Sequence, residues 1–82
     1  NAKAHLARAV ELMRVIDASA WDAGSVKAAV WPYAESAGRG NVLWPIRFSL
    51  SGREKSPDPF ELSGILGKDE TIARLTDICE KL

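Results

Sequence analysis

Apolar side chains recur at steps of three and four residues along most of the chain, which is the spacing of amphipathic helices. The first run covers residues 3–16, where Leu6, Val10 and Met13 share one face and no helix breaker interrupts them. Residues 17–20 then have the composition of a turn. The pattern therefore predicts a first helix over residues 3–16.

A second helix is predicted to begin at Asp22, whose side chain can accept hydrogen bonds from the free N–H groups of the first turn. Pro32 falls within this run of apolar residues. Because proline removes one backbone hydrogen bond and crowds the preceding turn, we expect it to kink the helix or to end it at Trp31. Gly38 and Gly40 then predict the end of the segment and the loop after it.

The third predicted helix covers residues 42–50, with Asn41 as its N-terminal cap and Gly52 as its end. Pro45 falls in the first turn of this helix, where its missing N–H group costs no hydrogen bond. Alternating residues in this segment also suit a short strand. We prefer the helix because no second strand is predicted elsewhere in the chain to pair with it.

Two further helix starts lie in the last third of the chain. Asp58 precedes Pro59, and proline is a preferred residue at the first helical position, so this pair predicts a short helix over residues 59–66. Asp69 is expected to cap the last helix, residues 70–81, whose apolar positions repeat at helical spacing.

The composition agrees with one small globular domain, since 46% of the 82 residues are hydrophobic and 27% are charged. The five runs together predict an all-α fold, a small bundle or cage of about five short helices, with residues 1–82 forming a single domain. No apolar run approaches the roughly 20 residues of a membrane-spanning helix, so we expect no membrane contact. The sequence opens without methionine, which suits either a piece of a larger protein or a trimmed chain.

Cysteine and histidine each occur once, as Cys79 and His5. A single cysteine cannot form an internal disulfide, which suits a reducing cytoplasm. Neither residue has the partners for a metal site or a catalytic set, and the sequence contains no nucleotide-binding fingerprint. We therefore expect no catalytic residue, no metal and no cofactor within this chain.

The formal net charge is zero, but basic residues gather in one segment. Residues 38–56 contain Arg39, Arg47, Arg53 and Lys55 and only one acidic residue. Such an asymmetry directs a polyanion to one face of a molecule. A solvated loop with an accidental excess of charge is the alternative, and the charge pattern alone leaves it open.

Three pieces of sequence carry a family resemblance: PIRFSLSG at residues 45–52, SPDPFEL at residues 56–62 and ILGKDETIARL at residues 65–75. In this order they resemble the C-terminal end of bacterial-type glutamyl-tRNA synthetases. That family reads approximately P-L-R-x-x-L-T-G, a T/G-P pair and L-G-K/R-x-x-x-x-x-R-L. The resemblance implies the all-helical, C-terminal anticodon-binding domain of a class I glutamate–tRNA ligase. It is strong over residues 42–82 and looser before them.

The resemblance also implies what the whole enzyme does. The full-length ligase would join glutamate to its tRNA with ATP in the cytoplasm. This domain would contribute recognition and no catalytic residue. Its partners would be the anticodon loop of the tRNA and the upstream catalytic domains of the same chain.

The residues that match the family pattern near the anticodon bases are Arg47, Ser56, Pro57, Pro59 and Phe60. Pro59 stands where the family often has leucine, which leaves the local loop geometry open. The residue types suit the role, because guanidinium and aromatic groups stack on unpaired bases and prolines offer flat apolar surface. Arg53 and Lys55 are expected to hold phosphates.

Several of these residues also have a purely structural interpretation. Arg47 would then join two helices through a carboxylate, Phe60 would belong to the core, and the prolines would only stiffen a connection. The tryptophans Trp21, Trp31 and Trp44 are expected in the core rather than beneath bases, since a small core needs large side chains.

Two other functions remain open from the sequence. A helical protein-interaction module would use residues 57–66 as its docking edge. A helix-turn-helix DNA binder is the weaker alternative, because its recognition helix should carry several exposed polar and basic residues. The last predicted helix offers only Arg74 and Lys81.

Overall fold

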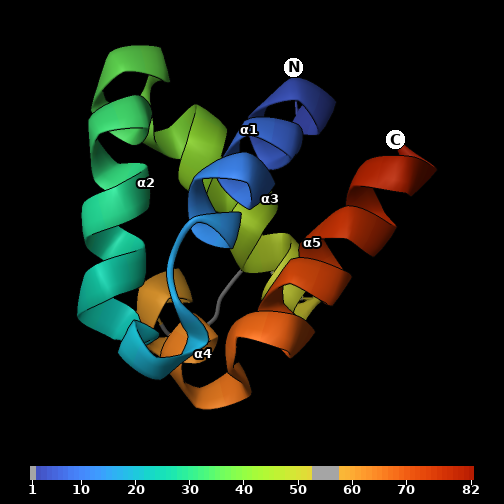
Figure 1. Ribbon diagram of the computed structural model, residues 1–82. Helices are drawn as coiled ribbons and strands as arrows, with labels where there is room; N and C mark the ends of the chain where they lie inside the picture. Colours follow the sequence, from blue (N-terminus) through green and yellow to red (C-terminus); the bar gives the residue numbers. More distant parts are fainter. Residues whose placement is uncertain (1, 53–57) are drawn as a thin grey trace.

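A computed structural model describes residues 2–52 and 58–82 of the chain. Its helices are α1 (Ala2–Arg14), α2 (Ala23–Ala37), α3 (Arg39–Ser51), α4 (Pro59–Leu66) and α5 (Lys68–Lys81), and Ala18–Ala20 form a short 3₁₀ turn (Figure 1). No strand occurs within the described ranges. The prediction of an all-α bundle of about five short helices is confirmed.

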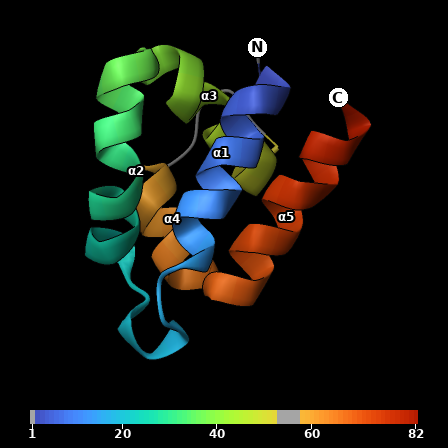
Figure 2. The same ribbon diagram turned by 45° about the horizontal axis from the view of Figure 1, so that its top comes forward.

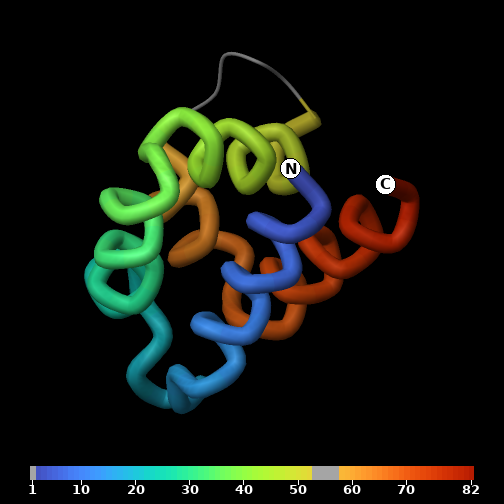
Figure 3. The backbone as a smooth tube through the Cα atoms, turned by 90° about the horizontal axis from the view of Figure 1, so that it is seen from above, coloured from blue at the N-terminus to red at the C-terminus, as the bar shows by residue number. Residues whose placement is uncertain are grey.

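The helices pack around a common interior. α1 packs against α2, α3 and α5, and Figure 2 shows it between α2 and α5. α4 closes the end of the bundle that lies away from the two chain termini (Figure 1). Seen from above, α3 runs along one edge of the molecule (Figure 3). One side of α3, which carries Asn41, Trp44 and Phe48, is exposed to solvent.

Buried apolar side chains from all five helices form one core. Burying each of the larger ones stabilises the fold by about 1.5–3 kcal/mol. The positions predicted for the buried face of α1, namely Leu6, Val10 and Met13, are confirmed. The complete set is Leu6, Ala9, Val10, Met13, Val26, Val30, Ala34, Val42, Ile46, Leu50, Phe60 and Leu75.

α1 ends at Arg14, earlier than the predicted end at Ile16, and a side chain of α5 bonds to main-chain carbonyls at and just after this end. Lys68 Nζ donates hydrogen bonds to Arg14 O (3.1 Å) and to Ile16 O (2.5 Å). A cation in this position replaces hydrogen bonds that the helix cannot make to itself, and it suits the negative end of the helix dipole.

Asp22 caps α2 as predicted. Its Oδ1 accepts a hydrogen bond from Ser25 N (2.7 Å), and Ser25 Oγ accepts one from Asp22 N (3.0 Å). The two residues therefore satisfy each other's free N–H groups at the start of the helix.

Of the two effects predicted for Pro32, a kink or an end at Trp31, the end at Trp31 is wrong, because α2 continues through Pro32 to Ala37. Proline removes the N–H group that would bond to the carbonyl four residues earlier, at Ala28. Both Pro32 and Ala28 are exposed, so water can take the place of the missing donor. A proline on the solvent side of a helix therefore does not end it here.

One residue, Gly38, separates α2 from α3. Its φ of 102° favours glycine, and an added Cβ would lie 2.7 Å from the amide nitrogen of Asn41. The predicted loop at Gly40 and the predicted cap at Asn41 are both wrong, since α3 already begins at Arg39. Asn41 Nδ2 instead donates to Ala37 O (3.3 Å), at the end of α2.

The sequence had predicted Pro45 in the first turn of its helix. This prediction is wrong, because Pro45 lies in the middle of α3. The carbonyl that loses its partner belongs to Asn41, which is exposed to solvent. The Ser49 hydroxyl donates to Pro45 O (2.7 Å), so this buried side chain has its hydrogen bond. The buried ring of Pro45 therefore packs inward without breaking the helix.

Asp58 and Pro59 start α4 as predicted, and Asp58 Oδ1 accepts a hydrogen bond from Phe60 N (2.7 Å). The predicted cap at Asp69 is wrong, because α5 already begins at Lys68. Asp69 lies in the first turn of α5, where its negative charge still favours the helix dipole.

One buried carbonyl, Ser63 O, links three parts of the fold. It accepts hydrogen bonds from Trp21 Nε1 before α2 (2.8 Å), from Gly67 N at the end of α4 (3.0 Å) and from Thr71 Oγ1 of α5 (3.3 Å). Ser63 and Thr71 are completely buried. Because a buried polar group without a partner is costly, these donors fix α4 between its neighbours.

We expect Thr71→Val to lower the free energy of unfolding by about 1 kcal/mol, since valine keeps the shape of threonine but cannot donate to Ser63 O. Urea denaturation followed by circular dichroism measures the change. Thr76→Val is the matched control, because the buried Thr76 hydroxyl has no hydrogen-bond partner within the described part of the chain. Equal losses in the two variants would contradict the importance of the Thr71 bond.

Candidate nucleic-acid interface

Four of the seven residues predicted to contact RNA lie outside the described residues: Arg53, Lys55, Ser56 and Pro57. The other three, Arg47, Pro59 and Phe60, are described. The geometry of the candidate interface therefore rests on α3 and on the start of α4.

Arg47 lies on α3 and is half-buried. Its Nε is a buried nitrogen without a hydrogen-bond partner in the part of the chain that the structure describes. The ion pairs between described residues are Arg8–Glu11, Arg74–Glu70 and Lys81–Asp77, and none of them includes Arg47. A carboxylate that would make Arg47 a link between helices is thus missing among the described residues.

The last turn of α3, just after Arg47, is held by several contacts. Ser51 Oγ donates to Arg47 O (2.8 Å), and Gly52 N donates to Phe48 O (2.7 Å). From α5, Arg74 Nη1 donates to Leu50 O (2.6 Å). These bonds fix the backbone that carries Arg47.

Pro59 and Phe60 lie inside the domain. Phe60 is 4% exposed and its ring meets the ring of Trp31 edge-on, with a centroid distance of 6.3 Å. Pro59 is also fully buried. This burial favours the alternative in which Phe60 belongs to the core, and we expect both residues to shape the start of α4 rather than to touch a base.

An exposed aromatic pair, Trp44 and Phe48, lies on α3. Trp44 is 49% exposed and Phe48 is 37% exposed, and their rings stack with a centroid distance of 5.5 Å and an interplanar angle of 12°. The prediction that all three tryptophans belong to the core is wrong for Trp44. Trp21 and Trp31 are partly buried and pack against the core as predicted.

The sequence did contain a signal for the aromatic pair. Trp44 and Phe48 are four residues apart and so lie on the same side of a helix. The buried positions of that helix include Val42, Ile46 and Leu50. A helical projection of residues 39–51 would therefore have separated the aromatic pair from the core residues.

The aromatic pair borders an apolar hollow of about 130 Å³. This hollow lies where α3 meets the first turn of α1 and the last turn of α5, beside both ends of the chain. Its remaining lining consists of Ala2, Leu6, Pro45, Ile78 and Leu82.

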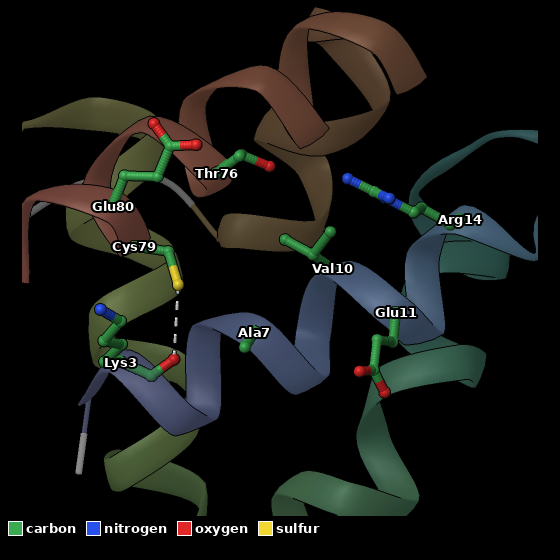
Figure 4. Close-up of a pocket in the computed structure, with 8 residues that line it drawn as sticks. All are labelled: Lys3, Ala7, Val10, Glu11, Arg14, Thr76, Cys79 and Glu80. Carbon is green, nitrogen blue, oxygen red and sulfur yellow. Dashed lines mark hydrogen bonds between the residues drawn. The ribbon is translucent and has the colours of Figure 1, made fainter.

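A second concavity, a groove of about 300 Å³, lies between α1 and α5 (Figure 4). Its rim carries Lys3 and Arg14 but also Glu11 and Glu80, so the charges on it are mixed. Cys79 Sγ lies 3.6 Å from Lys3 O on this rim. The described residues contain no group of three or more histidine, cysteine or acidic side chains that could hold a metal ion.

One carboxyl in the described part of the chain has a clearly perturbed pKa, and it lies outside this interface. The pKa of Asp17 is lowered, chiefly by the hydrogen bond from the Ser19 backbone N–H and then by the Ser19 hydroxyl. Its role is to cap the 3₁₀ turn, with Asp17 Oδ1 3.0 Å from Ser19 N.

Comparison with known proteins gives one family and a set of related enzymes. The chain matches the family described as "Anticodon binding domain" over residues 1–79. It is 49% identical over 59 residues to glutamate–tRNA ligase 1 of Methylobacterium radiotolerans, which covers 70% of this chain and 12% of that protein. It is 38% identical over 79 residues to glutamate–tRNA ligase of Azorhizobium caulinodans, which covers 94% of this chain and 16% of that protein.

A third relative agrees with the first two. The chain is 43% identical over 63 residues to glutamate–tRNA ligase of Rhodopseudomonas palustris, covering 74% of this chain and 13% of that protein. The chain therefore spans only 12% to 16% of the length of these relatives. No solved structure matches it. Within the described residues, no helix is both long and apolar enough to cross a membrane.

We expect Arg47→Met to change the free energy of unfolding by less than about 0.5 kcal/mol, because methionine keeps an apolar stem and Arg47 Nε has no described partner to lose. Arg74→Met should lower it by about 1 kcal/mol, since Arg74 donates to Leu50 O. Urea denaturation of both variants checks this. A larger loss for Arg47→Met than for Arg74→Met would favour the alternative in which Arg47 links helices.

Proposed function

The chain belongs to the anticodon binding domain family, and we propose that it recognises the anticodon loop of a glutamate tRNA as one domain of a glutamate–tRNA ligase. The names of its relatives support the choice of ligase. The family match favours this function over a protein-interaction module without RNA binding.

The observation that carries the proposal is the combination of groups on α3. Arg47 follows Trp44 by three residues, so Arg47 and the aromatic pair lie on adjacent sides of α3. The pair exposes apolar ring surface, on which an unpaired base can stack. The planar fork of an arginine can stack on a base as well or bind a phosphate in two places.

Electrostatics support binding through a local surface rather than through the whole domain. The formal net charge is zero, so the domain as a whole does not attract a polyanion. Arg53 and Lys55 are proposed to hold phosphates next to the bases that α3 contacts. Because the isolated domain lacks a general positive field, we expect most of the affinity for tRNA to need the rest of the ligase.

The whole enzyme would divide its work between domains. The upstream domains of the same chain would join glutamate to the tRNA with ATP, and this domain would supply recognition without forming bonds. A cytoplasmic location follows from this role in translation. Variants of the domain should therefore change the KM for tRNA more than the kcat.

We expect Arg47→Ala and Trp44→Ala, each made in the full-length ligase, to raise the KM for tRNA by roughly 5- to 140-fold. This range corresponds to the loss of about 1–3 kcal/mol from one good base contact. Steady-state charging assays with the glutamate tRNA measure the change. The KM values for glutamate and ATP should stay the same, because those substrates would bind elsewhere.

Arg8→Ala is the control for the loss of one positive charge, since Arg8 pairs with Glu11 on the exposed side of α1. Its KM for tRNA should equal that of the unchanged enzyme. If Arg47→Ala and Trp44→Ala charge tRNA with unchanged KM, α3 is not the recognition surface. If Arg8→Ala raises the KM as much as Arg47→Ala does, general charge rather than a specific contact would explain the effect.

A further inference from the structure

We propose that Arg74 of α5 is a positioning residue that holds the RNA-binding side of α3 in place. This inference rests on the proposed function, because it assigns a task to Arg74 only if α3 recognises RNA. Arg74 lies on α5, and α5 packs against α3 (Figure 1).

The contact itself is a hydrogen bond from a charged side chain to the end of a helix. Arg74 Nη1 lies 2.6 Å from Leu50 O, and Arg74 Nε lies 3.4 Å from Glu70 Oε2. Leu50 is one of the last four residues of α3, whose carbonyls have no partner within the helix. The guanidinium thus satisfies one of these carbonyls and places a positive charge at the negative end of the helix dipole.

The position of Arg47 depends on this helix end. Leu50 follows Arg47 by three residues and so lies one turn further along α3. Ser51, the last residue of the helix, donates its hydroxyl to Arg47 O (2.8 Å). If the last turn unwinds, the hydroxyl contact is lost and the backbone beneath Arg47 and Phe48 is no longer fixed.

Arg74 is not needed to hold the core together. Its side chain is 41% exposed, and both helices, which pack against each other, contribute buried apolar residues to the common core, such as Ile46 on α3 and Leu75 on α5. Replacing Arg74 should therefore loosen the end of α3 without unfolding the domain.

Lys68 provides a matched comparison on the same helix. It too uses a cation to satisfy main-chain carbonyls, but these belong to Arg14, at the end of α1, and to Ile16, just after it. No residue of α1 is proposed to contact RNA. Replacing either Arg74 or Lys68 should therefore lower the stability of the domain. Only the replacement of Arg74 should also weaken tRNA binding, because only Arg74 holds the end of α3.

The test uses the full-length ligase with Arg74→Ala, Arg74→Lys, Lys68→Ala and Arg47→Ala. We expect Arg74→Ala to raise the KM for tRNA by roughly 2- to 25-fold with unchanged kcat, the range found for residues that act through others. Arg74→Lys should recover part of this loss, because an ammonium can still donate to Leu50 O. Lys68→Ala should leave the KM for tRNA unchanged while lowering the melting temperature about as much as Arg74→Ala.

Two further readouts separate positioning from direct contact with RNA. Amide hydrogen exchange in residues 48–52 of the ligase should become faster in Arg74→Ala and stay the same in Lys68→Ala. The slope of the logarithm of tRNA affinity against the logarithm of salt concentration should not change in Arg74→Ala, because no phosphate contact is removed. A smaller slope would show that Arg74 itself binds a phosphate and would overturn the inference.

The KM values for tRNA also separate a failure of the positioning role from a failure of the proposed function. If Arg47→Ala raises the KM for tRNA but Arg74→Ala does not, the positioning role is wrong and the proposed function stands. If neither variant changes the KM, the proposed function fails. Equal increases in Arg74→Ala and Lys68→Ala would mean that stability alone is responsible, and unchanged exchange in residues 48–52 would equally rule out positioning.

Discussion

Hydrogen bonds from side chains of α5 to main-chain carbonyls determine how the ends of two other helices are held, and the candidate RNA-binding side of α3 depends on one of them. Lys68 holds the end of α1 and Arg74 holds the end of α3. Both bind main-chain oxygens, so they fix where a helix ends and not merely that two helices lie close together. The buried Ser63 carbonyl fixes α4 in a similar way, through side-chain donors from two other segments, Trp21 before α2 and Thr71 of α5. The last turn of α3, next to Arg47 and Phe48, is thus held by contacts within the helix and from α5.

Much of the fold could be predicted because its signals are local. The apolar positions of α1 and the caps at Asp22 and Asp58 follow from spacing and side-chain chemistry that a sequence shows directly. The errors arose where tertiary contacts or solvent decide. Pro32 did not end α2, since water can reach the carbonyl that it leaves unpaired. Asn41 bonds to the end of α2 instead of starting α3.

The candidate interface was predicted in part. Arg47 on α3 was identified from its place in a family pattern, and it has a nitrogen that no described residue satisfies. Phe60 was assigned to the same surface, but its burial depends on where α4 packs, which no short motif reveals. Trp44 was expected in the core by residue type alone, although its spacing from Phe48 places both on the open side of α3.

Ultraviolet cross-linking of the full-length ligase to its glutamate tRNA, with the adducts located by mass spectrometry, tests most directly whether α3 is the recognition element. We predict adducts between nucleotides of the anticodon loop and residues 44–48, because the exposed rings of Trp44 and Phe48 would lie against the bases. Adducts confined to other helices, such as the groove between α1 and α5, together with unmodified α3 peptides, would contradict this assignment.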